Sequence, residues 1–388
     1  MIKKSTVSLA QDTIDATDIS KLINWLSQDG VRLTQGPATI LFENKCSQWL
    51  DTGFGTMVNS GSSANLLMIY SLLASKQLLP GDRVVVPALC WATDLAPIIQ
   101  LGLTPVLCDC NMDDLSVDID MLKEIFERDN PKALMLVSVL GFVPDMEKIV
   151  SICDEYRVIL LEDVCESTGS MFNNRKLGTF GLMSTFSFYF GHHISTIEGG
   201  MVCSHSAEMN DVLKSLRSHG WDRDTSEDFK KQKREMWNVS DFNASFTFYY
   251  PGFNLRGNDL QAQMGLFQLE KINAVCEKRN FNLRFYLENL PDSFWRPKLR
   301  DNCFISNFSY PLIHEKRDDI VTALIKEGIE CRPLICGSMG RQPFFVERYG
   351  EVSFPNVDKI DKFGMYIPNH PNLSLADLEK ITTILKEF

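Results

Sequence analysis

Residues 185–200 read Thr185-Phe-Ser-Phe-Tyr-Phe-Gly-His-His-Ile-Ser-Thr-Ile-Glu-Gly-Gly200. The stretch predicts a strand, a short turn that Glu198-Gly199-Gly200 closes, and a second strand. His192 and His193 are adjacent, so on an extended segment their side chains point to opposite faces and only one can face a ligand. A lone histidine is more often a hydrogen-bonded structural residue. An imidazole with a pKa near ~6.5 is also suited to proton transfer near neutrality, so one of the pair is a candidate base.

Outward from this stretch, short apolar runs alternate with helical patterns. Apolar residues recur at helical spacing at positions 64, 67 and 68, and again at 146, 149, 150 and 153. This alternation, with continuously apolar strands, predicts an α/β fold with a mainly parallel sheet covered on both faces. The predicted strands are residues 83–87, 105–108, 133–137, 158–161, 184–189 and 200–204.

The C-terminal third has a different pattern. A long helical pattern covers residues 259–287, a half-exposed strand covers 304–312, and two helices are expected at 318–327 and 375–386. We therefore expect a large domain over residues 1–258 and a smaller α+β domain over 259–388. Residues 222–245 are polar and charged, which predicts a surface excursion that forms a solvated loop or a lid.

Composition excludes several classes of protein. The 388 residues carry a net charge of −11, which argues against a general nucleic-acid binder, although a few local arginines could still bind an anionic small ligand. No apolar run approaches the ~20 residues of a membrane span. Residues 1–5 lead into a polar segment, so we expect no secretion signal and a cytoplasmic protein. The eleven cysteines are expected to be reduced and mostly buried, and Cys108-Asp-Cys110 is interpreted as a strand end, with no metal site expected.

Two further motifs could bind charged groups of a ligand. Asn59-Ser-Gly-Ser-Ser-Ala64 opens a helix, where small residues let backbone N–H groups approach an anion such as phosphate; an ordinary helix N-cap is the alternative. Leu160-Leu-Glu-Asp163 ends an apolar strand with two carboxylates, which are either a solvated strand end or a means of holding a cation. Trp91 follows a strand and could simply belong to the core.

Together these motifs resemble the sugar aminotransferases of the DegT/DnrJ/EryC1/StrS family, which are fold-type I enzymes that use pyridoxal phosphate. The resemblance runs from Gln35-Gly-Pro37 to Glu330-Cys-Arg-Pro333. It implies an aspartate aminotransferase-like fold and a set of cofactor-binding residues. In that set Gly61, Ser62 and Ser187 bind the cofactor phosphate, Trp91 stacks on the pyridine ring, Asp163 keeps the ring nitrogen protonated, and Glu166 stands where the family usually has Gln or His near the phenolic oxygen.

His192 occupies the position at which most family members have a lysine that forms a Schiff base with the cofactor. Imidazole has no primary amine, so the resemblance implies a non-covalently bound cofactor and a catalytic base at His192, with His193 structural. The histidine motif is most similar to a dehydratase branch of the family. That branch removes the C-3 hydroxyl of GDP-linked 4-keto-6-deoxymannose on the way to colitose, a 3,6-dideoxysugar of some O-antigens. Glutamate would regenerate pyridoxamine phosphate, and ammonia would be released.

Four more residues match family segments. His219 and Arg223 are expected in the sugar pocket, although a surface loop is an alternative for Arg223. Asn254 matches a segment that reaches the cofactor phosphate of the neighbouring subunit, which implies a homodimer with shared active sites. Arg332 is a candidate anion contact or a surface arginine.

Two alternatives to the dehydratase stay open. An ordinary sugar aminotransferase would need a lysine near the cofactor, and the nearest upstream, Lys176, lies in a predicted turn and out of register. A non-catalytic sugar-nucleotide sensor or scaffold would also lack the lysine, but it would have no use for an electron sink. An iron–sulfur dehydratase is rejected because its C-x-C motif is missing: the cysteines after His192 are Cys203, Cys276, Cys303, Cys331 and Cys336.

Overall fold

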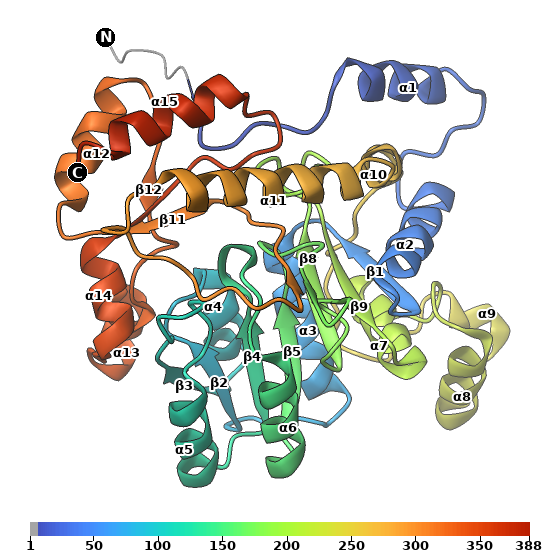
Figure 1. Ribbon diagram of the computed structural model, residues 1–388. Coiled ribbons are helices and arrows are strands. Elements are labelled where there is room, and N and C mark those ends of the chain that lie inside the picture. Colours follow the sequence, from blue (N-terminus) through green and yellow to red (C-terminus); the bar gives the residue numbers. More distant parts are fainter. Residues whose placement is uncertain (1–6) are drawn as a thin grey trace.

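The centre of the molecule is a seven-stranded sheet (Figure 1). The computed structural model describes residues 7–388, so residues 1–5, on which the expected lack of a secretion signal depends, lie outside the described residues. All neighbouring pairs from β8 to β3 are parallel and only β9 runs against the others, so the predicted mainly parallel sheet is confirmed. In order across the sheet the strands are β1 (Phe54–Val58), β9 (Gly200–Ser204), β8 (Met183–Ser187), β5 (Ile159–Asp163), β4 (Ala133–Val137), β2 (Arg83–Pro87) and β3 (Thr104–Cys108).

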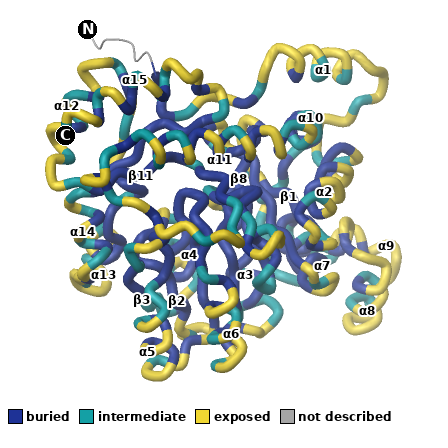
Figure 2. Tube along the Cα trace, viewed as in Figure 1, coloured by how far each residue is buried: buried dark blue, intermediate teal, exposed yellow. Residues whose placement is uncertain are grey.

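Helices cover both faces of this sheet. In Figure 1, α6 lies in front of it, against β5, whereas α3 lies behind it and contacts β8 and β9. All five residues of β4 are buried, as expected of a strand covered on both sides. Figure 2 shows the strands at the centre as buried and the outer turns of α5 and α6 as exposed. The helices of this layer are α2 (Pro37–Leu50), α3 (Gly61–Ala74), α4 (Ala92–Gln100), α5 (Ile119–Asp129), α6 (Met146–Tyr156) and α7 (Ala207–Arg217).

The C-terminal part packs over the carboxyl ends of the central strands. The predicted single helix over residues 259–287 is wrong in detail, because the chain turns at 270–271 between two helices. The predicted strand over 304–312 is also two short strands, because Phe308 N and the Asn307 side chain both donate to Leu140 O and bend the chain toward the central sheet. The elements are α10 (Asp259–Leu269), α11 (Ile272–Asn289), β10 (Cys303–Phe304), β11 (Tyr310–Ile313), α12 (Arg317–Lys326), β12 (Arg332–Pro333), α13 (Pro343–Tyr349), α14 (Pro355–Phe363), β13 (Gly364–Ile367) and α15 (Leu375–Leu385).

Two small sheets and two 3₁₀ helices lie outside the central sheet. The strands β11, β13 and β12 form one antiparallel sheet, and β10 joins a two-stranded hairpin in another. The hairpin strands are β6 (Met171–Phe172) and β7 (Arg175–Lys176), and the 3₁₀ helices are Val139–Gly141 and Met339–Arg341.

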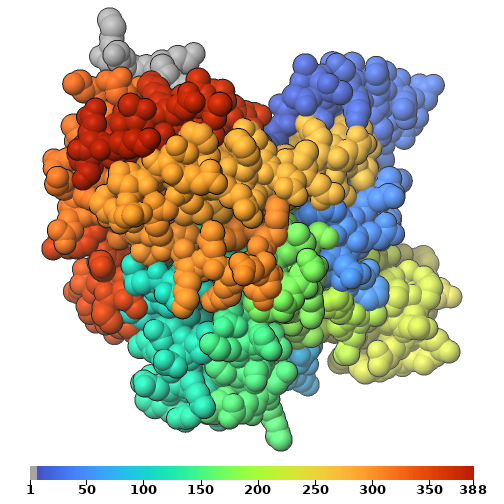
Figure 3. Space-filling view, in the orientation of Figure 1, coloured from blue at the N-terminus to red at the C-terminus, as the bar shows by residue number. Residues whose placement is uncertain are grey.

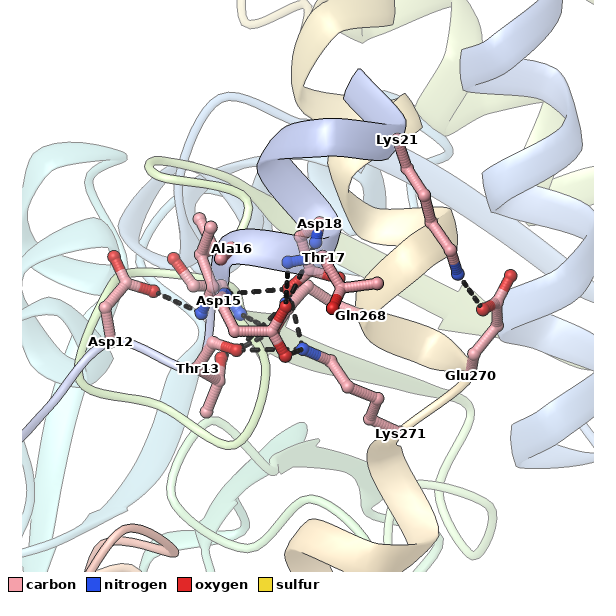
Figure 4. A network of polar contacts seen from close by, with 12 residues as sticks. Asp12, Thr13, Asp15, Ala16, Thr17, Asp18, Lys21, Gln268, Glu270 and Lys271 are labelled. Atoms are coloured by element: carbon pink, nitrogen blue, oxygen red, sulfur yellow. Dashed lines mark hydrogen bonds and ion pairs between the residues drawn. The ribbon is translucent and has the colours of Figure 1, made fainter. Parts of the chain in front are cut away.

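The N-terminal segment runs across both parts of the molecule. Val7 pairs with Ile329, and Leu9 N donates to the Glu330 carboxylate. Helix α1 (Ala16–Leu26) then packs on α10, where Asp18 accepts from Gln268 and Lys271, each at 2.6 Å (Figure 4). Because α10 also packs on α2, the N-terminal segment and α10 link the two parts. The division at residues 258 and 259 stays a prediction.

The polar segment over residues 222–245 projects from the surface, as predicted, but it is not a solvated loop. It contains α8 (Glu227–Trp237) and α9 (Asp241–Ala244), and Figure 3 shows it as a separate lobe below α1 and α2. Arg234 donates to the buried Asp222 at 2.8 Å within the segment. Ser226, which caps α8, donates to the Asp211 carboxylate of α7 at 2.7 and 2.6 Å, and these bonds tie α8 to the body of the protein. The charged composition therefore reflects an exposed amphipathic helix.

None of the described helices is both long and apolar enough to cross a membrane. Cys108 and Cys110 are buried, and burial raises the pKa of both thiols. Over residues 7–388 no three histidine, cysteine or carboxylate side chains lie together as a metal site would require.

Candidate active site

A cavity of about 370 Å³ lies at the carboxyl ends of the central strands. This is where open α/β sheets usually bind their ligands. Segments after β1, β2, β4, β5 and β8 form its floor, and residues of α11, β12 and β13 close it from the C-terminal side. Eight of the eleven predicted site residues line it: Gly61, Ser62, Trp91, Asp163, Glu166, Ser187, His192 and Arg332.

One end of the cavity suits an anion. Ser60 caps the N-terminus of α3, whose first residues, Gly61 and Ser62, line the cavity. A Cβ atom on Gly61 would lie 2.6 Å from the Ser187 Cβ, and one on Gly200 would overlap the Ser60 backbone. Glycine is therefore required at both positions for the helix N-terminus, β8 and β9 to meet. The backbone N–H groups, the helix dipole and two serine hydroxyls gather at this end.

The cavity lining also carries a fixed carboxylate. Asp163 is buried, and its two oxygens accept from Cys165 N at 2.8 Å and from the Asn65 side chain at 2.7 Å. Glu162 does not line the cavity, because alternate residues of β5 point to opposite sides. Its carboxylate accepts three backbone N–H bonds at 2.7 Å, from residues 178, 180 and 181. The strand end is therefore not solvated, and of its two carboxylates Asp163 is the one that lines the cavity.

Two other predicted residues line the same cavity. Trp91 is 55% exposed and lines the cavity, so it is not a core residue. Glu166 accepts from Leu140 N at 2.9 Å, and burial raises the pKa of its carboxyl to about 7. Glu166 can therefore exchange a proton near neutral pH.

The two histidines have separate environments. They lie in an irregular connection between β8 and β9, not on an extended strand as expected, yet only His192 lines the cavity. His193 is 1% exposed and its Nε2 lies 3.0 Å from Ser306 O. Burial lowers the pKa of His192 to about 4, although the Asp163 charge acts in the opposite direction. Nδ1 of His192 has no hydrogen-bond partner among the described residues. The ring is therefore a neutral base at pH 7.

A buried arginine that the sequence did not single out supports this connection. Arg279 of α11 is 1% exposed, and its guanidinium donates to the carbonyl oxygens of Phe308 at 2.7 Å, Asn369 at 3.0 Å and His192 at 3.3 Å. Its charge also contributes to the low pKa of His192. Its position within a long amphipathic helix gave no signal in the sequence.

The remaining predicted residues are not brought to the cavity of their own chain. Asn254 accepts from Arg256 Nε at 3.0 Å, and the His219 ring packs 5.0 Å from that of Trp221. Arg223 donates to Ser245 O and lies 3.7 Å from the Trp221 ring centroid. None of these three lines the cavity.

The described lining also contains no lysine. Lys176 lies on the β6–β7 hairpin with its Nζ 4.9 Å from the Trp49 ring centroid, and it is not among the lining residues. The aminotransferase alternative needs a lysine beside the cofactor, and the described lining of this chain's own cavity provides no lysine.

Comparison with known proteins agrees with this geometry. The family model described as the DegT/DnrJ/EryC1/StrS aminotransferase family matches residues 13–386. The GDP-4-keto-6-deoxy-D-mannose 3-dehydratase of Escherichia coli O55:H7 is 32% identical, over 97% of this chain and 99% of that protein. The lipopolysaccharide biosynthesis protein RfbH of Salmonella typhimurium is 29% identical, over 99% of this chain and 92% of that protein.

A solved structure is also similar over nearly its whole length. GDP-4-keto-6-deoxymannose-3-dehydratase with a trapped PLP-glutamate geminal diamine superposes with a TM-score of 0.90 at 32% identity, covering 98% of this chain and 100% of that chain. The predicted aminotransferase fold of pyridoxal phosphate enzymes is thereby confirmed. This chain belongs to the DegT/DnrJ/EryC1/StrS aminotransferase family.

Proposed function

We propose that this chain is a 3-dehydratase that removes the C-3 hydroxyl of a nucleotide-linked 4-keto-6-deoxysugar, with GDP-4-keto-6-deoxymannose as its substrate. The observation that carries the proposal is a cavity whose described lining holds His192 and no lysine. The 32% identity to a dehydratase of that substrate supports the sugar and the nucleotide. The similarity to a lipopolysaccharide biosynthesis protein supports a role in O-antigen synthesis.

The cavity has the groups that pyridoxal or pyridoxamine phosphate would require. Gly61, Ser62 and Ser187 would hold the phosphate, since they gather donors at a helix N-terminus. Asp163 would hold the protonated pyridine nitrogen, since its carboxylate is fixed by two donors. Trp91 would stack on the ring, since its indole is exposed to the cavity. When bound, the cofactor supplies an electron sink, and without a lysine it is held non-covalently.

His192 would move the protons. At pH 7 it is neutral, because burial lowers its pKa to about 4, so it can accept a proton from carbon next to the cofactor ring. The same imidazole can return the proton in the half-reaction with glutamate. Glu166, which lines the same cavity and has a pKa of about 7, is a second group that could donate or accept a proton. Arg332 lines the cavity and could bind an anionic part of the substrate.

The reaction consumes glutamate. Replacing the C-3 hydroxyl by hydrogen is a two-electron reduction of the sugar that releases water. Conversion of glutamate and water to 2-oxoglutarate and ammonia supplies those electrons and protons. One glutamate is therefore consumed, and one ammonia released, for each sugar deoxygenated.

An absorbance titration tests the proposal. Purified protein is mixed with pyridoxal phosphate, desalted, and then mixed with glutamate. We expect the aldehyde band to give way to the amine band while 2-oxoglutarate forms. Binding without a response to glutamate, or no binding, would favour the non-catalytic alternative. A 4-amino sugar as the final product would favour the aminotransferase.

We further propose a homodimer with shared active sites in the cytoplasm. Asn254 and His219 match family segments but do not line this chain's own cavity, which supports a role in a neighbouring subunit's site. All eleven cysteines are free, the state that a reducing compartment maintains.

A further inference from the structure

Two buried polar residues of the cavity lining have no role of their own in the proposal above, beyond the hydrogen bond from Asn65 to Asp163. Asn65 of α3 is 2% exposed and Asp94 of α4 is 1% exposed, and both border the cavity. Buried polar groups cost free energy unless they are hydrogen-bonded, so their partners indicate why they are present. Asn65 also follows Ala64 in a helix whose other inward side chains are mostly apolar.

The Asn65 amide joins three structural elements. Its nitrogen lies 2.7 Å from Asp163 Oδ2 and 2.9 Å from Asp94 Oδ1, and its oxygen accepts from the Thr185 hydroxyl at 2.6 Å. Asp163 ends β5, Asp94 lies in the first turn of α4, and Thr185 lies in β8. The Asp163 oxygen that does not accept from Cys165 is therefore oriented by Asn65.

Asp94 extends the same network to the indole. Its second oxygen accepts from Trp91 N at 3.0 Å, at the start of α4. No described cation pairs with Asp94, and burial, followed by the nearby Asp163 charge, raises the pKa of its carboxyl well above the usual range. A protonated Asp94 avoids placing a second negative charge beside Asp163.

We propose that Asn65 and Asp94 are positioning residues for the cofactor ring: they hold the Asp163 carboxylate and the Trp91 backbone in one buried network. This inference rests on the proposed function, because it concerns the same cofactor site. Asp163 would hold the ring nitrogen and Trp91 would stack on the ring face, so the network would fix two sides of a ring that no covalent bond restrains.

The test compares Asn65→Leu and Asp94→Asn with the wild-type protein. Leucine has a similar size but no amide, and Asp94→Asn keeps the shape while it can no longer accept from both Trp91 and Asn65. Three properties are measured: the dissociation constant of pyridoxamine phosphate, the visible circular dichroism of bound pyridoxal phosphate, and the ¹⁵N chemical shift of its pyridine nitrogen. We expect about 10- to 100-fold weaker binding, as for a lost hydrogen bond to a charged group, with an altered ellipticity and shift.

Asn210→Leu is the matched control. Asn210 of α7 is also a buried amide, but it accepts from Thr56 at 3.0 Å and does not line the cavity. It should lower the Tm without changing the cofactor signals. If the effects of Asn65→Leu and Asp94→Asn arise from one network, the double variant should lose much less binding free energy than the sum of the losses in the two single variants.

The outcomes are distinguishable. The inference alone would be overturned if the wild-type protein binds the cofactor and the Asn65→Leu and Asp94→Asn proteins fold and keep its affinity, ellipticity and ¹⁵N shift. Wild-type protein that binds neither form of the cofactor would overturn the proposed function and the inference together.

Discussion

A single side chain separates this site from one that can bind its cofactor covalently. Histidine at position 192 cannot bond to an aldehyde cofactor, but its neutral ring can still accept a proton. Its pKa is low because it is buried and lies near Arg279, and Asp163 acts against that shift. The proposed chemistry therefore depends on proton transfer and on non-covalent retention.

His192→Asn should bind pyridoxal phosphate but react slowly with glutamate. Asparagine retains hydrogen-bonding capacity but cannot accept a proton, so we expect the amine band to form about 10³-fold more slowly. Stopped-flow absorbance after mixing with glutamate measures the rate. A rate within tenfold of wild type would show that another group is the base.

His370 provides a test of stability against pH. It is 2% exposed, and burial, with the Arg279 charge, lowers its pKa to about 4. Between pH 6.5 and 4 the unfolded chain binds a proton at this histidine that the folded chain does not. The contribution of the neutral His370 to folding stability is therefore complete above pH 6.5 and is lost as the pH falls. When the pH is lowered from 7.5 to 5.5, the free energy of unfolding of His370→Phe should therefore fall by about 1 kcal/mol less than that of the wild type. Urea denaturation at both values measures it, and equal losses would contradict the assigned shift.

Some site residues could be predicted from the sequence and others could not. Asp163, Ser187 and His192 stand in motifs that occupy short, continuous stretches, and all three line the cavity. Asn65 is three residues from the predicted Ser62, but its partners are 29, 98 and 120 residues away. A polar residue within an apolar helical pattern is a signal, but its partners become visible only in three dimensions.

At the scale of elements, the N-terminal helix α1 is held by a polar network and not by a deep apolar contact. Ile19, Ile23 and Leu26 of this helix are exposed, whereas Asp18 is buried against α10 (Figure 4). Lys271 binds Asp18 at 2.6 Å and Asp15 at 3.0 Å. Residues 13–26 therefore depend on a few charged contacts.

Lys271→Met should loosen this helix. It leaves the buried Asp18 carboxylate without its cation, so we expect a loss of about 2 kcal/mol of stability. Faster hydrogen exchange should be confined to residues 13–26. Lys21→Met is the control, because Lys21 and Glu270 form a largely exposed pair whose loss should cost less than about 1 kcal/mol. Similar exchange in both variants would contradict the role given to Asp18.

The sequence predicted elements best where apolar residues form a continuous local pattern. The strands at 83–87 and 133–137 were predicted at their observed bounds. Predictions were wrong where tertiary contacts decide: Phe308 and Asn307 bend the chain through Leu140, which is more than 160 residues away. Likewise, the charged segment after residue 222 forms α8, because caps and an ion pair to Asp222 stabilise it.

At the scale of the whole molecule, the proposed shared site makes activity a property of two subunits. His192→Asn and Asn254→Ala should each be inactive or weak alone. In an equal mixture, mixed dimers would carry one site with both native residues, so about a quarter of wild-type activity should return after co-expression. Activity no higher than the mean of the two single variants would place Asn254 outside the partner's site.

The measurement that tests the central claim most directly is a product analysis with GDP-4-keto-6-deoxymannose, pyridoxal phosphate and glutamate. Proton NMR of the sugar and assays of 2-oxoglutarate and ammonia are run on the same reaction. The account predicts a C-3 methylene and equal amounts of deoxysugar, 2-oxoglutarate and ammonia. A sugar that keeps its C-3 hydroxyl and gains a C-4 amino group, with no free ammonia, would contradict it.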